Sequence, residues 1–541
     1  MPSRSPGPFP DSPDDATVTP SPLAPLKHEV FRLLWSVTLV ANVCMWMNDV
    51  AAAWMMASLD ASPAWVALVQ TASNLPVFLL GLPSGALADI LDRRRFFIFT
   101  QFWIAGISLL LCTAVLLDMV TPVLLLALTF ANGIGLAMRW PLYAALVPEL
   151  VPRAELPSAL ALNAVAMNVS RIAGPLGAGL LIASAGSGYV FMLTGAISVL
   201  SGMCLLRWQR NHVVSPLGPE HLGRAIKVGL QFVRHSATMK SVLLRVSLFF
   251  FHAITLQALL PLVARGLGDG GANAYTLLLA SMGCGAVFTV VLLPRLRTGM
   301  SRDRLVMYST MLQAAMMAVV AHAPNVYVAA PAMFICGMAW ISSVNTLTVS
   351  AQLALPDWVR ARAMSVYQMA IMGAGALGAA FWGQVAAFSS VQSSLLMASV
   401  SGALSMAAAW YFMKVNISEE DLRPSHELPV PAVTSPPGDG QVLVTIEYQI
   451  DPLRANEFVA LMEESRRHRL RQGVLSWNLL HDIARPERYI EQVLDVSWTE
   501  YLRRFDRHTG ADVTLRDRKL AFHVGDAAPE VTRYVVRIPT V

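Results

Sequence analysis

Two apolar runs, each long enough to cross a bilayer, are joined by the stretch Gly85-Ala-Leu-Ala-Asp89-Ile-Leu-Asp92-Arg93-Arg94-Arg95. A turn between two membrane helices must not be drawn into lipid, and three consecutive guanidinium groups prevent that. Arginines in short loops also mark the cytoplasmic side of a membrane protein. The stretch therefore predicts a helical hairpin whose turn faces the cytoplasm.

The composition of the whole chain agrees with a membrane protein. Of its 541 residues, 55% are hydrophobic and only 14% are charged, whereas a soluble protein carries roughly 25% charged residues. The net charge of +5 could indicate a nucleic-acid partner, but we attribute it to arginines that face the cytoplasm and anionic lipid. We therefore expect an all-α polytopic membrane protein that binds no nucleic acid.

The apolar runs predict about twelve transmembrane helices, in two sets of six. Turns such as Asp60-Ala-Ser-Pro63 and Ala323-Pro-Asn325 separate them. The predicted spans are 30–56, 64–87, 96–117, 121–146, 157–183, 188–206, 241–264, 274–294, 304–322, 326–351, 363–388 and 392–413.

The arginines of the short loops give the orientation. One set of alternate loops holds almost all of them, and Arg265 is the exception on the other side. Both termini are therefore expected in the cytoplasm, with the spans in the inner (plasma) membrane. The arginine-bearing loops contain Arg93, Arg94, Arg95, Arg153, Arg207, Arg210, Arg295, Arg297, Arg302, Arg304, Arg360 and Arg362.

Composition also divides the chain into segments. Residues 1–28 are rich in Pro, Ser and Asp and predict a disordered tail without a cleavable signal peptide. The six-helix halves occupy 29–206 and 241–416, and the basic connection 207–240 carries an amphipathic helix of the interfacial kind. A Pro-rich linker, 417–440, is expected to hold the last domain away from the membrane without docking it rigidly.

Residues 441–541 predict a small soluble α+β domain. Apolar residues alternate in 442–450, further strands are expected at 473–481, 488–496 and 531–538, and helices lie between them. The order β-α-β-β-α-β is that of a ferredoxin-like domain. Its histidines have no metal-ligand spacing, so we expect no metal and no cofactor there; they are His468, His481, His508 and His523.

The loop at Gly85 resembles the signature of the major facilitator superfamily, in which a Gly, an Asp four residues later and a basic cluster join the second and third helices. Ile90 and Asp92 depart from that pattern. PELVPRAELPSALALNAVAMNVSRIAGPLGAGL from Pro148, and LPDWVRARAMSVYQ at 355–368, resemble the enterobactin-exporter branch, the transmembrane secretion effectors. The resemblance implies a 6+6 helix fold and export of small molecules.

The domain at 441–541 resembles the antibiotic-biosynthesis-monooxygenase type, which implies self-association through its sheet.

Within the fifth span, four residues resemble the antiporter motif of the superfamily: Gly174, Pro175, Gly177 and Gly179. Proline removes a helix hydrogen bond, and glycines permit bending and close packing. The resemblance implies export in exchange for protons. A kinked packing helix without information on direction is the alternative.

A second group of residues could form a gate on the cytoplasmic side. Asp89 could pair with Arg139 in the fourth span and hold the gate closed, although Arg139 could instead extend to the membrane surface. An ordinary positively charged loop is the alternative for the whole group. Its members are Gly85, Asp89, Asp92, Arg93, Arg94, Arg95 and Arg139.

A third group could line the path of substrate and protons. Arg171 lies roughly 21 Å from the cytoplasmic end of its span at 1.5 Å per residue, so it needs a water-filled cavity or a partner. Asp49 could be the protonation site, a partner of Arg171 or an interfacial residue, and His252 could titrate near neutral pH or simply pack. The other candidates, each of which could instead bond helix to helix, are Asn48, Gln70, Asn74, Asn163, Asn168 and Gln257.

The sequence thus predicts a secondary-active exporter that is not an enzyme. It has no Walker loop and no dinucleotide-binding glycine motif, so ATP is not expected to drive it directly. The expected partners are protons, membrane lipid and a small amphipathic, drug-like or siderophore-like substrate. A membrane-anchored sensor, or a haem-binding or oxygenase-type enzyme that uses the C-terminal domain, is the alternative.

Overall fold

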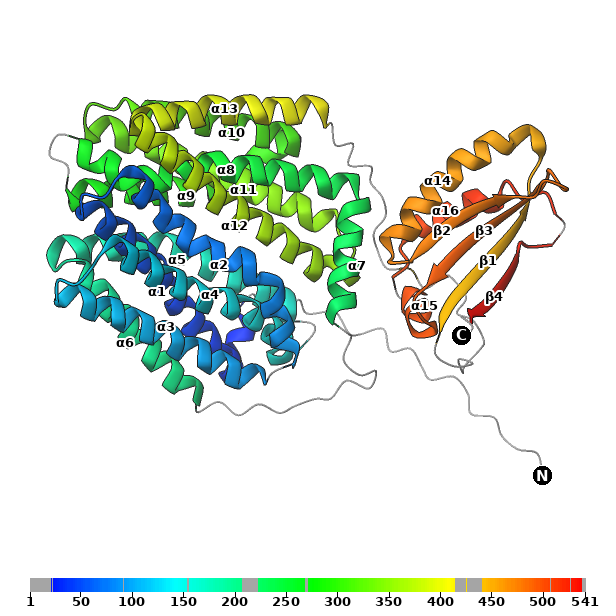
Figure 1. Ribbon diagram of the computed structural model, residues 1–541, viewed down its shortest axis with the longest axis horizontal. Coiled ribbons are helices and arrows are strands. Elements are labelled where there is room, and N and C mark those ends of the chain that lie inside the picture. Colours follow the sequence, from blue (N-terminus) through cyan, green and yellow to red (C-terminus); the bar gives the residue numbers. More distant parts are fainter. Residues whose placement is uncertain are drawn as a thin grey trace.

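The computed structural model describes residues 23–90, 92–152, 155–206, 222–267, 271–413, 440–505, 507–525 and 527–537, together with Ser21 and Ser425. Within these residues, twelve helices are long and apolar enough to cross a membrane, which confirms the predicted number of spans. They form one bundle (Figure 1). The spans are α1 (Glu29–Ser58), α2 (Pro63–Ile90), α3 (Arg93–Leu116), α4 (Pro122–Leu150), α5 (Leu156–Ser184), α6 (Ser187–Leu206), α8 (Ala237–Gly266), α9 (Ala272–Gly299), α10 (Arg302–Ala321), α11 (Val326–Leu353), α12 (Asp357–Phe388) and α13 (Val391–Phe412).

Short polar side chains set where many of these helices begin. Asp92, Thr121 and Asn325 each accept a hydrogen bond from the backbone N–H three residues later, at the starts of α3, α4 and α11. Such caps satisfy backbone donors that a helix cannot pair internally. A short 3-10 helix, η1 (Ala24–Lys27), precedes α1 inside the segment expected to be a disordered tail.

The two halves of the bundle repeat one packing plan, which the sequence reveals only faintly. In the first half α1 packs on α5, α2 on α4 and α3 on α6. In the second half α8 packs on α12, α9 on α11 and α10 on α13 in the same way. Contacts of α2 with α12 and of α5 with α9 join the halves. This confirms the 6+6 arrangement.

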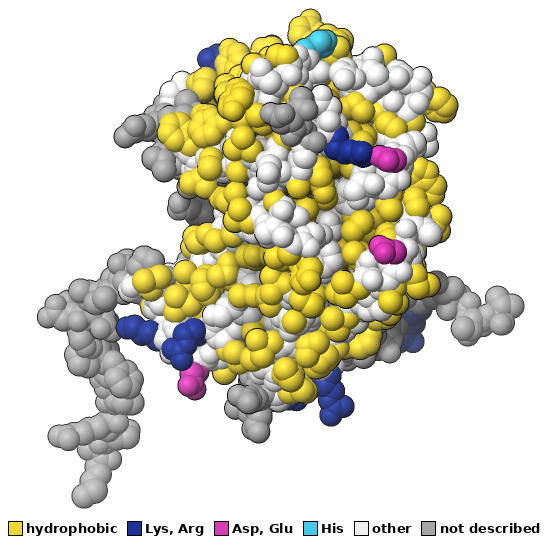
Figure 2. All heavy atoms as spheres, turned by 90° about the vertical axis from the view of Figure 1, so that its left-hand side faces the viewer, with side chains coloured by type: hydrophobic (Ala, Val, Ile, Leu, Met, Phe, Trp, Pro, Cys, Tyr) yellow, Lys and Arg dark blue, Asp and Glu magenta, His cyan; other side chains and the backbone are white. Residues whose placement is uncertain are grey.

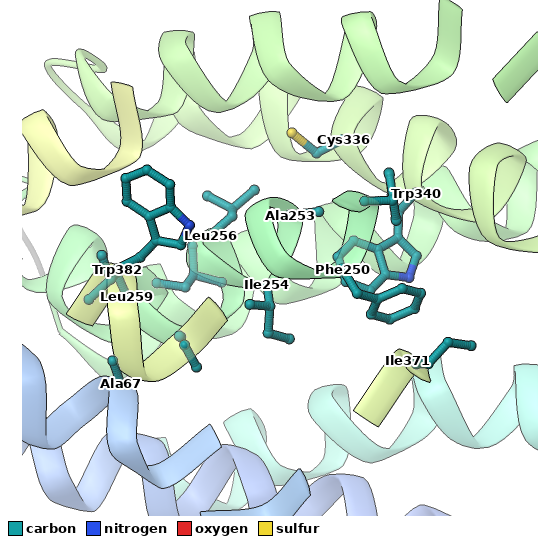
Figure 3. Close-up of a cluster of buried hydrophobic side chains, with 14 of the residues drawn as sticks. Ala67, Phe250, Ala253, Ile254, Leu256, Leu259, Cys336, Trp340, Ile371 and Trp382 are labelled. Atoms are coloured by element: carbon teal, nitrogen blue, oxygen red, sulfur yellow. The ribbon is translucent and has the colours of Figure 1, made fainter. Parts of the chain in front are cut away.

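Many buried apolar side chains of the second half form one cluster. Phe250 of α8 packs edge-on against Trp340 of α11, with ring centres 5.3 Å apart, and Ile371 of α12 lies beside them (Figure 3). Trp382 of α12 packs at the other end of the same group. Large aromatic side chains contribute most of the contact area in such a core, so α8, α11 and α12 are held together firmly.

The predicted amphipathic connection forms α7 (Leu222–His235), which runs across the ends of the spans (Figure 1). Its Phe232 packs edge-on against Trp358 at the start of α12, with ring centres 5.9 Å apart. Gly229 lies against Arg362 of α12. We call α7 and the first turns of α12 the platform, and the end of the bundle that carries it the near end; the opposite end is the far end.

The C-terminal domain has a four-stranded antiparallel sheet in the order β2-β3-β1-β4, as expected for a ferredoxin-like domain. Phe458 and Met462 of the first helix pack on Tyr448 and Tyr489 of the sheet. A second cluster is formed mainly by Val442, Val493, Trp498 and Tyr501. The elements are β1 (Gln441–Gln449), η3 (Pro452–Arg454), α14 (Ala455–Arg471), β2 (Ser476–His481), β3 (Arg488–Asp495), α15 (Trp498–Phe505), α16 (Gly510–Leu520) and β4 (Glu530–Val536).

A buried ion cluster fills the space between this sheet and its helices. Glu491 is fully buried and accepts hydrogen bonds from Lys519 (3.2 Å), Trp477 (2.9 Å) and Ser465 (3.2 Å). Burial alone would raise the pKa of Glu491, but Lys519, the nearby Arg469 and the Trp477 donor outweigh it and hold the pKa well below its usual range. The carboxylate is therefore charged at neutral pH and its charge is compensated.

The C-terminal domain contacts the platform, and the expectation that the linker does not dock it rigidly stays a prediction. Gln231 of α7 donates a hydrogen bond of 2.8 Å to the Val474 carbonyl oxygen, just after α14. The Arg507 guanidinium lies over the Trp358 ring of the platform, 5.4 Å from its centre. Figure 1 shows the domain beside α7. Aromatic and cationic side chains on both partners explain why the domain docks there.

We predict that Glu491→Ala lowers the free energy of unfolding of the isolated domain, residues 440–541, by about 3–5 kcal/mol, because it leaves Lys519 buried without a counter-charge. Chemical denaturation followed by circular dichroism measures this. Glu457→Ala, which removes an exposed carboxylate, is the control and should have little effect.

The wild-type domain should also lose stability in acid. The folded pKa of Glu491 lies below the unfolded value of roughly 4.3, so the stabilisation is complete above that value and is lost as pH falls toward the folded pKa. Equal acid sensitivity of wild type and Glu491→Ala would contradict this assignment.

Candidate functional site

Asp49 of α1 is held by the neighbouring helix. Its carboxylate accepts a hydrogen bond of 2.8 Å from Ser73 of α2, and the adjacent Asn48 is buried. Asp49 is the twenty-first residue of α1, and Gln257 is the twenty-first residue of α8, which has the same length. A carboxyl group and an amide therefore occupy equivalent positions in the two halves, toward the far end.

Arg171 of α5 faces an aromatic ring. Its guanidinium lies 5.6 Å from the centre of the Trp46 ring on α1, which is cation–π distance. Trp46 is one helical turn from Asp49, but among the described residues no ion pair joins Arg171 to that carboxylate. The aromatic face therefore takes the place of the predicted carboxylate partner in this conformation.

The candidate asparagines divide into two kinds. Asn163 accepts a hydrogen bond of 2.7 Å from the Tyr143 hydroxyl, which ties α5 to α4. Asn168 donates to the Ala164 carbonyl oxygen of its own helix, at 2.9 Å. Asn163 thus acts as a bond between helices here, whereas Asn168 satisfies its own backbone and is exposed.

The polar residues of α2 lie against the other half. Thr71, which sequence analysis missed, donates a hydrogen bond of 2.9 Å to the Ala376 carbonyl oxygen of α12. Asn74 packs so close that a Cβ added to Gly375 of α12 would lie 3.2 Å from the Asn74 amide nitrogen. Gln70, one turn before Asn74, is half-buried. Contacts between the halves thus cluster around Gln70 and Asn74.

His252 lies apart from Asp49. Its Nδ1 is 2.8 Å from the Leu248 carbonyl oxygen of its own helix, and its ring is 5.8 Å from the Trp382 ring. It lines a small cavity between α8, α10 and α13 in the second half. The structure therefore does not bring His252 and Asp49 into one site.

The predicted gate is only partly described. The side chains of Gly85 and Asp89 lie outside the described residues, so their pairing stays a prediction. Asp92 caps α3 by accepting from the Arg95 backbone N–H at 3.0 Å, and Arg94 donates to the Leu206 carbonyl oxygen at 2.7 Å. Arg93 begins the same helix. The arginine cluster therefore also fixes helix ends.

Arg139 has a partner that sequence analysis missed. It is 1% exposed, so it does not extend to the membrane surface. It donates a hydrogen bond of 2.6 Å to Asn42, a buried residue in the middle of α1. The sequence feature that could have identified Asn42 is its side-chain amide inside an apolar span, because such an amide needs a polar partner.

The glycines of the antiporter-like motif differ in how much room they leave. A Cβ on Gly174 would lie 2.4 Å from the Trp46 Cβ, and one on Gly179 would lie 2.2 Å from Thr276 of α9. A Cβ on Gly177 would have ordinary contacts, 3.7 Å from Met47. Pro175 lies inside the helix between these contacts. Gly174 and Gly179 therefore allow α5 to approach α1 and α9.

Further contacts join the halves at the far end. Arg265 of α8 donates to the Asp60 carboxylate at 2.7 Å and also to the Ala57 carbonyl oxygen at the end of α1. Trp54 of α1 stacks on Tyr275 of α9, with ring centres 5.4 Å apart. A guanidinium at a helix C-terminus is favourable because of the helix dipole. Arg265, the exception in the arginine pattern, thus bridges the halves.

These residues can bind protons and polar groups, but they do not form a metal centre. Within the described ranges, no group of three His, Cys, Asp or Glu side chains could hold a metal ion. Asp49 is a carboxyl group that accepts a hydrogen bond from α2. Arg139 is a buried cation, and Arg171 is a half-buried one. The arrangement suits reversible binding of a proton or a solute.

Comparison with known proteins shows similarity along nearly the whole chain. Residues 20–540 match the model of a family described as transmembrane secretion effector. The staphyloferrin A transporter of Staphylococcus aureus is 21% identical over 60% of this chain and 81% of its own length. An uncharacterized transporter of Bacillus subtilis, YfiS, is 27% identical over 42% of this chain, and macrolide efflux protein A of Streptococcus pyogenes is 23% identical over 44%. These matches span 55% and 60% of the two relatives' own lengths.

Solved structures share the fold. A bacterial homolog of the human lysosomal transporter Spinster, in an inward-facing and unoccupied conformation, superposes with a TM-score of 0.56 at 16% identity. The match covers 71% of this chain and 95% of that one. A POT family transporter gives a TM-score of 0.58 at 12% identity. At such low identities the likeness establishes the fold alone.

We predict that Gly179→Ala lowers the stability of the purified protein by about 1–3 kcal/mol, because its methyl group would overlap Thr276. Thermal unfolding in detergent measures this. Gly177→Ala, in the same motif but with free space around it, is the matched control and should unfold like wild type. Thr276→Ala removes two of the three overlapping atoms but leaves Cβ, 2.7 Å from the new methyl group, so it should restore part of the stability of Gly179→Ala. No restoration at all would contradict the contact.

Proposed function

The chain belongs to the transmembrane secretion effector family of the major facilitator superfamily, and from this premise we propose that it is a proton-driven exporter of small amphipathic molecules. Export, the coupling ion and the substrate class go beyond the family assignment. The match to Gly174, Pro175, Gly177 and Gly179 supports exchange, and the geometry around Asp49 supports proton binding.

The contacts between the halves support alternating access. At the far end, Arg265 with Asp60, Trp54 with Tyr275 and Gly179 with Thr276 would all have to separate for a solute to leave on that side. At the near end, we propose that Asp89 and Arg139 take part in the opposite gate. The substrate would bind between the halves, near Gln70, Asn74, Arg171 and Gln257.

We propose that the near end faces the cytoplasm, with both termini on that side of the plasma membrane. The positive-inside rule supports this orientation. Arg93, Arg94 and Arg360 lie at helix ends on the near side, whereas hydrophobic and uncharged side chains dominate the far end (Figure 2).

The relatives support a substrate class. Two of them are named for a siderophore, staphyloferrin A, and for macrolide efflux. We therefore propose siderophore-like or drug-like amphipathic metabolites as substrates, recognised by the aromatic and cationic pair Trp46 and Arg171.

Asp49→Asn should abolish pH-driven transport while the protein still folds and inserts, because the amide has a similar shape but cannot carry the proton. Uptake of a macrolide and of staphyloferrin A into inverted vesicles, with and without a pH gradient, measures this. Ser73→Ala is the control: it removes the hydrogen bond to Asp49 and leaves the carboxyl group. Full pH-driven uptake by Asp49→Asn would remove Asp49 from the mechanism.

For the C-terminal domain we propose self-association, with no catalytic role. The Glu491 cluster supports this, because it occupies the space between sheet and helices in which a ligand would have to bind. The open face of the sheet is apolar in part. Its residues include Leu443, Leu480, Ile490, Leu494 and Tyr534, and two of them, Leu480 and Tyr534, are 43% and 52% exposed.

The isolated domain, residues 440–541, should sediment as a dimer at high concentration, because burying this face removes apolar surface from water. Ile490→Lys, in the middle of the open face, should give a monomer. Asp517→Lys changes an exposed side chain on α16 and should leave the dimer intact. A wild-type domain that stays monomeric would defeat the proposal.

A second candidate role for the domain is regulation of transport. The contacts of Gln231 with Val474 and of Arg507 with Trp358 favour it, because both reach the platform at the start of α12. α12 also packs on α2 of the other half. A change in docking could therefore reach the contact between the halves.

Truncation of the chain after Ser418 distinguishes a domain that only self-associates from one that regulates transport. We expect the truncated protein to insert and to keep pH-driven uptake in inverted vesicles, because the twelve spans contain the whole proposed path. Arg507→Ala in the full chain, which removes one docking contact, should likewise transport. Loss of transport from a stably inserted truncated protein would favour regulation by the domain.

A further inference from the structure

The cavity that His252 lines combines an apolar wall with a few polar side chains. It lies between α8, α10 and α13, which pack on one another inside the second half. Its volume is about 20 Å³, measured as the space open to the centre of a water molecule, and a single water molecule needs roughly 10–15 Å³ of such space. Its lining includes His252, Thr310, Gln313, Met317, Ser399 and Gly402.

Two of these side chains are buried without partners. Gln313 is 2% exposed and Thr310 is 5% exposed. Among the described residues, neither the two amide atoms of Gln313 nor the Thr310 hydroxyl has a hydrogen-bond partner. By contrast, Ser399 donates to the Ala314 carbonyl oxygen at 2.8 Å. Buried polar groups are almost always hydrogen-bonded, and Gln313 and Thr310 can each take a partner from the cavity that they line.

His252 adds a defined acceptor to the cavity. A carbonyl oxygen can only accept, so the Nδ1 that lies 2.8 Å from the Leu248 oxygen carries the hydrogen. In the neutral ring, Nε2 therefore has the free lone pair. Gly402 makes room for the ring, because a Cβ there would lie 2.9 Å from the His252 Cβ.

We propose that this cavity binds a water molecule that joins the Gln313 amide to Nε2 of His252, and that His252 accepts a proton through it. Gln313, Thr310 and His252 together offer the two to four polar partners that a buried water needs. The water site rests on this geometry alone. Its use in coupling rests on the proposed proton-driven export, and would be a second proton site in the half opposite Asp49.

The transfer is a simple proton exchange. A proton reaches the site as hydronium, one O–H bond breaks, and an N–H bond forms at Nε2. Neutral water stays on Gln313, and the imidazolium keeps its Nδ1–H on the Leu248 oxygen. No oxidant, metal or other reactant is needed.

Among the described residues, no Asp, Glu, Lys or Arg lines the cavity, and His252 is its one ionisable side chain. The described charges of α10 are Arg302, Asp303 and Arg304 in its first turn. On α8, Arg245 lies toward the near end and pairs with Asp303 at 2.7 Å, and Arg265 lies at the far end. α13 contains no charged residue, and the charges of α12 lie in its first two turns, far along the helix from Trp382. The cavity therefore offers His252 hydrogen-bonding groups and no counter-charge.

X-ray pulse radiolysis of the full-length protein in nanodiscs tests for the water, because hydroxyl radicals formed from a bound water oxidise the side chains around it. Met317 lines the cavity and is 2% exposed, whereas Met333 of α11 is fully buried and does not line it. We expect Met317 to be oxidised faster than Met333. Equal, slow oxidation of both would overturn the water site.

Gln313→Leu should abolish the excess oxidation of Met317 and slow hydrogen–deuterium exchange at the imidazole carbon of His252. Gln101→Leu is the matched control, because Gln101 is an equally buried glutamine on α3, the equivalent helix of the first half. It should leave both readouts unchanged. If Gln313→Leu fails to fold, Gly402→Ala narrows the same cavity and should give the same losses. Wild-type values in the variants would overturn the proposal.

Transport then separates the two parts of the inference. In inverted vesicles, Gln313→Leu should shift the pH dependence of uptake, whereas Gln101→Leu should not. If Met317 is labelled as expected but Gln313→Leu keeps the wild-type pH dependence, the coupling role of His252 is overturned and the water site stands. A failure of proton-driven export altogether would show in wild type, before any variant is compared.

Discussion

In α5 and α12, glycines lie at the points where a helix of the other half comes closest. The arrangement of the two halves depends on these close helix contacts. A Cβ on Gly179 would overlap Thr276, and one on Gly383 would lie 2.4 Å from Ala67. Between helices in lipid there is little hydrophobic driving force, so close backbone packing has to supply the attraction. The same glycine contacts can separate without breaking many bonds. Alternating access requires an interface that can separate in this way.

Three ionisable side chains inside the spans have definite neighbours in the structure. Asp49 is held by Ser73, Arg139 by Asn42 and Arg171 by the face of Trp46. An ionisable group in a membrane is costly unless it is paired or hydrated. The partners found here are neutral, so an ion pair holds none of these three groups in this conformation.

The C-terminal domain combines a ferredoxin-like fold with a charged cluster in its interior. Its sheet and helices have the ferredoxin-like order, but the charged cluster around Glu491 fills the space between them. The domain instead presents two surfaces: one meets the platform through Arg507 and Trp358, and the open face of the sheet includes Leu480 and Tyr534. A domain with a filled core and two contact surfaces is suited to assembly or regulation.

The sequence by itself determined the number and order of spans, the amphipathic helix before the second half and the succession of strands and helices along the last domain, because hydrophobic periodicity is a local property of the chain. It also identified Asp49, Arg139, Arg171 and His252 as unusual, because each is an ionisable group inside an apolar run. Only the tertiary structure decided their partners: Arg139 and Asn42 are 97 residues apart in sequence, and which residues meet depends on how two helices pack. For the same reason it placed His252 in a cavity of its own and docked the C-terminal domain, since both follow from contacts between distant helices.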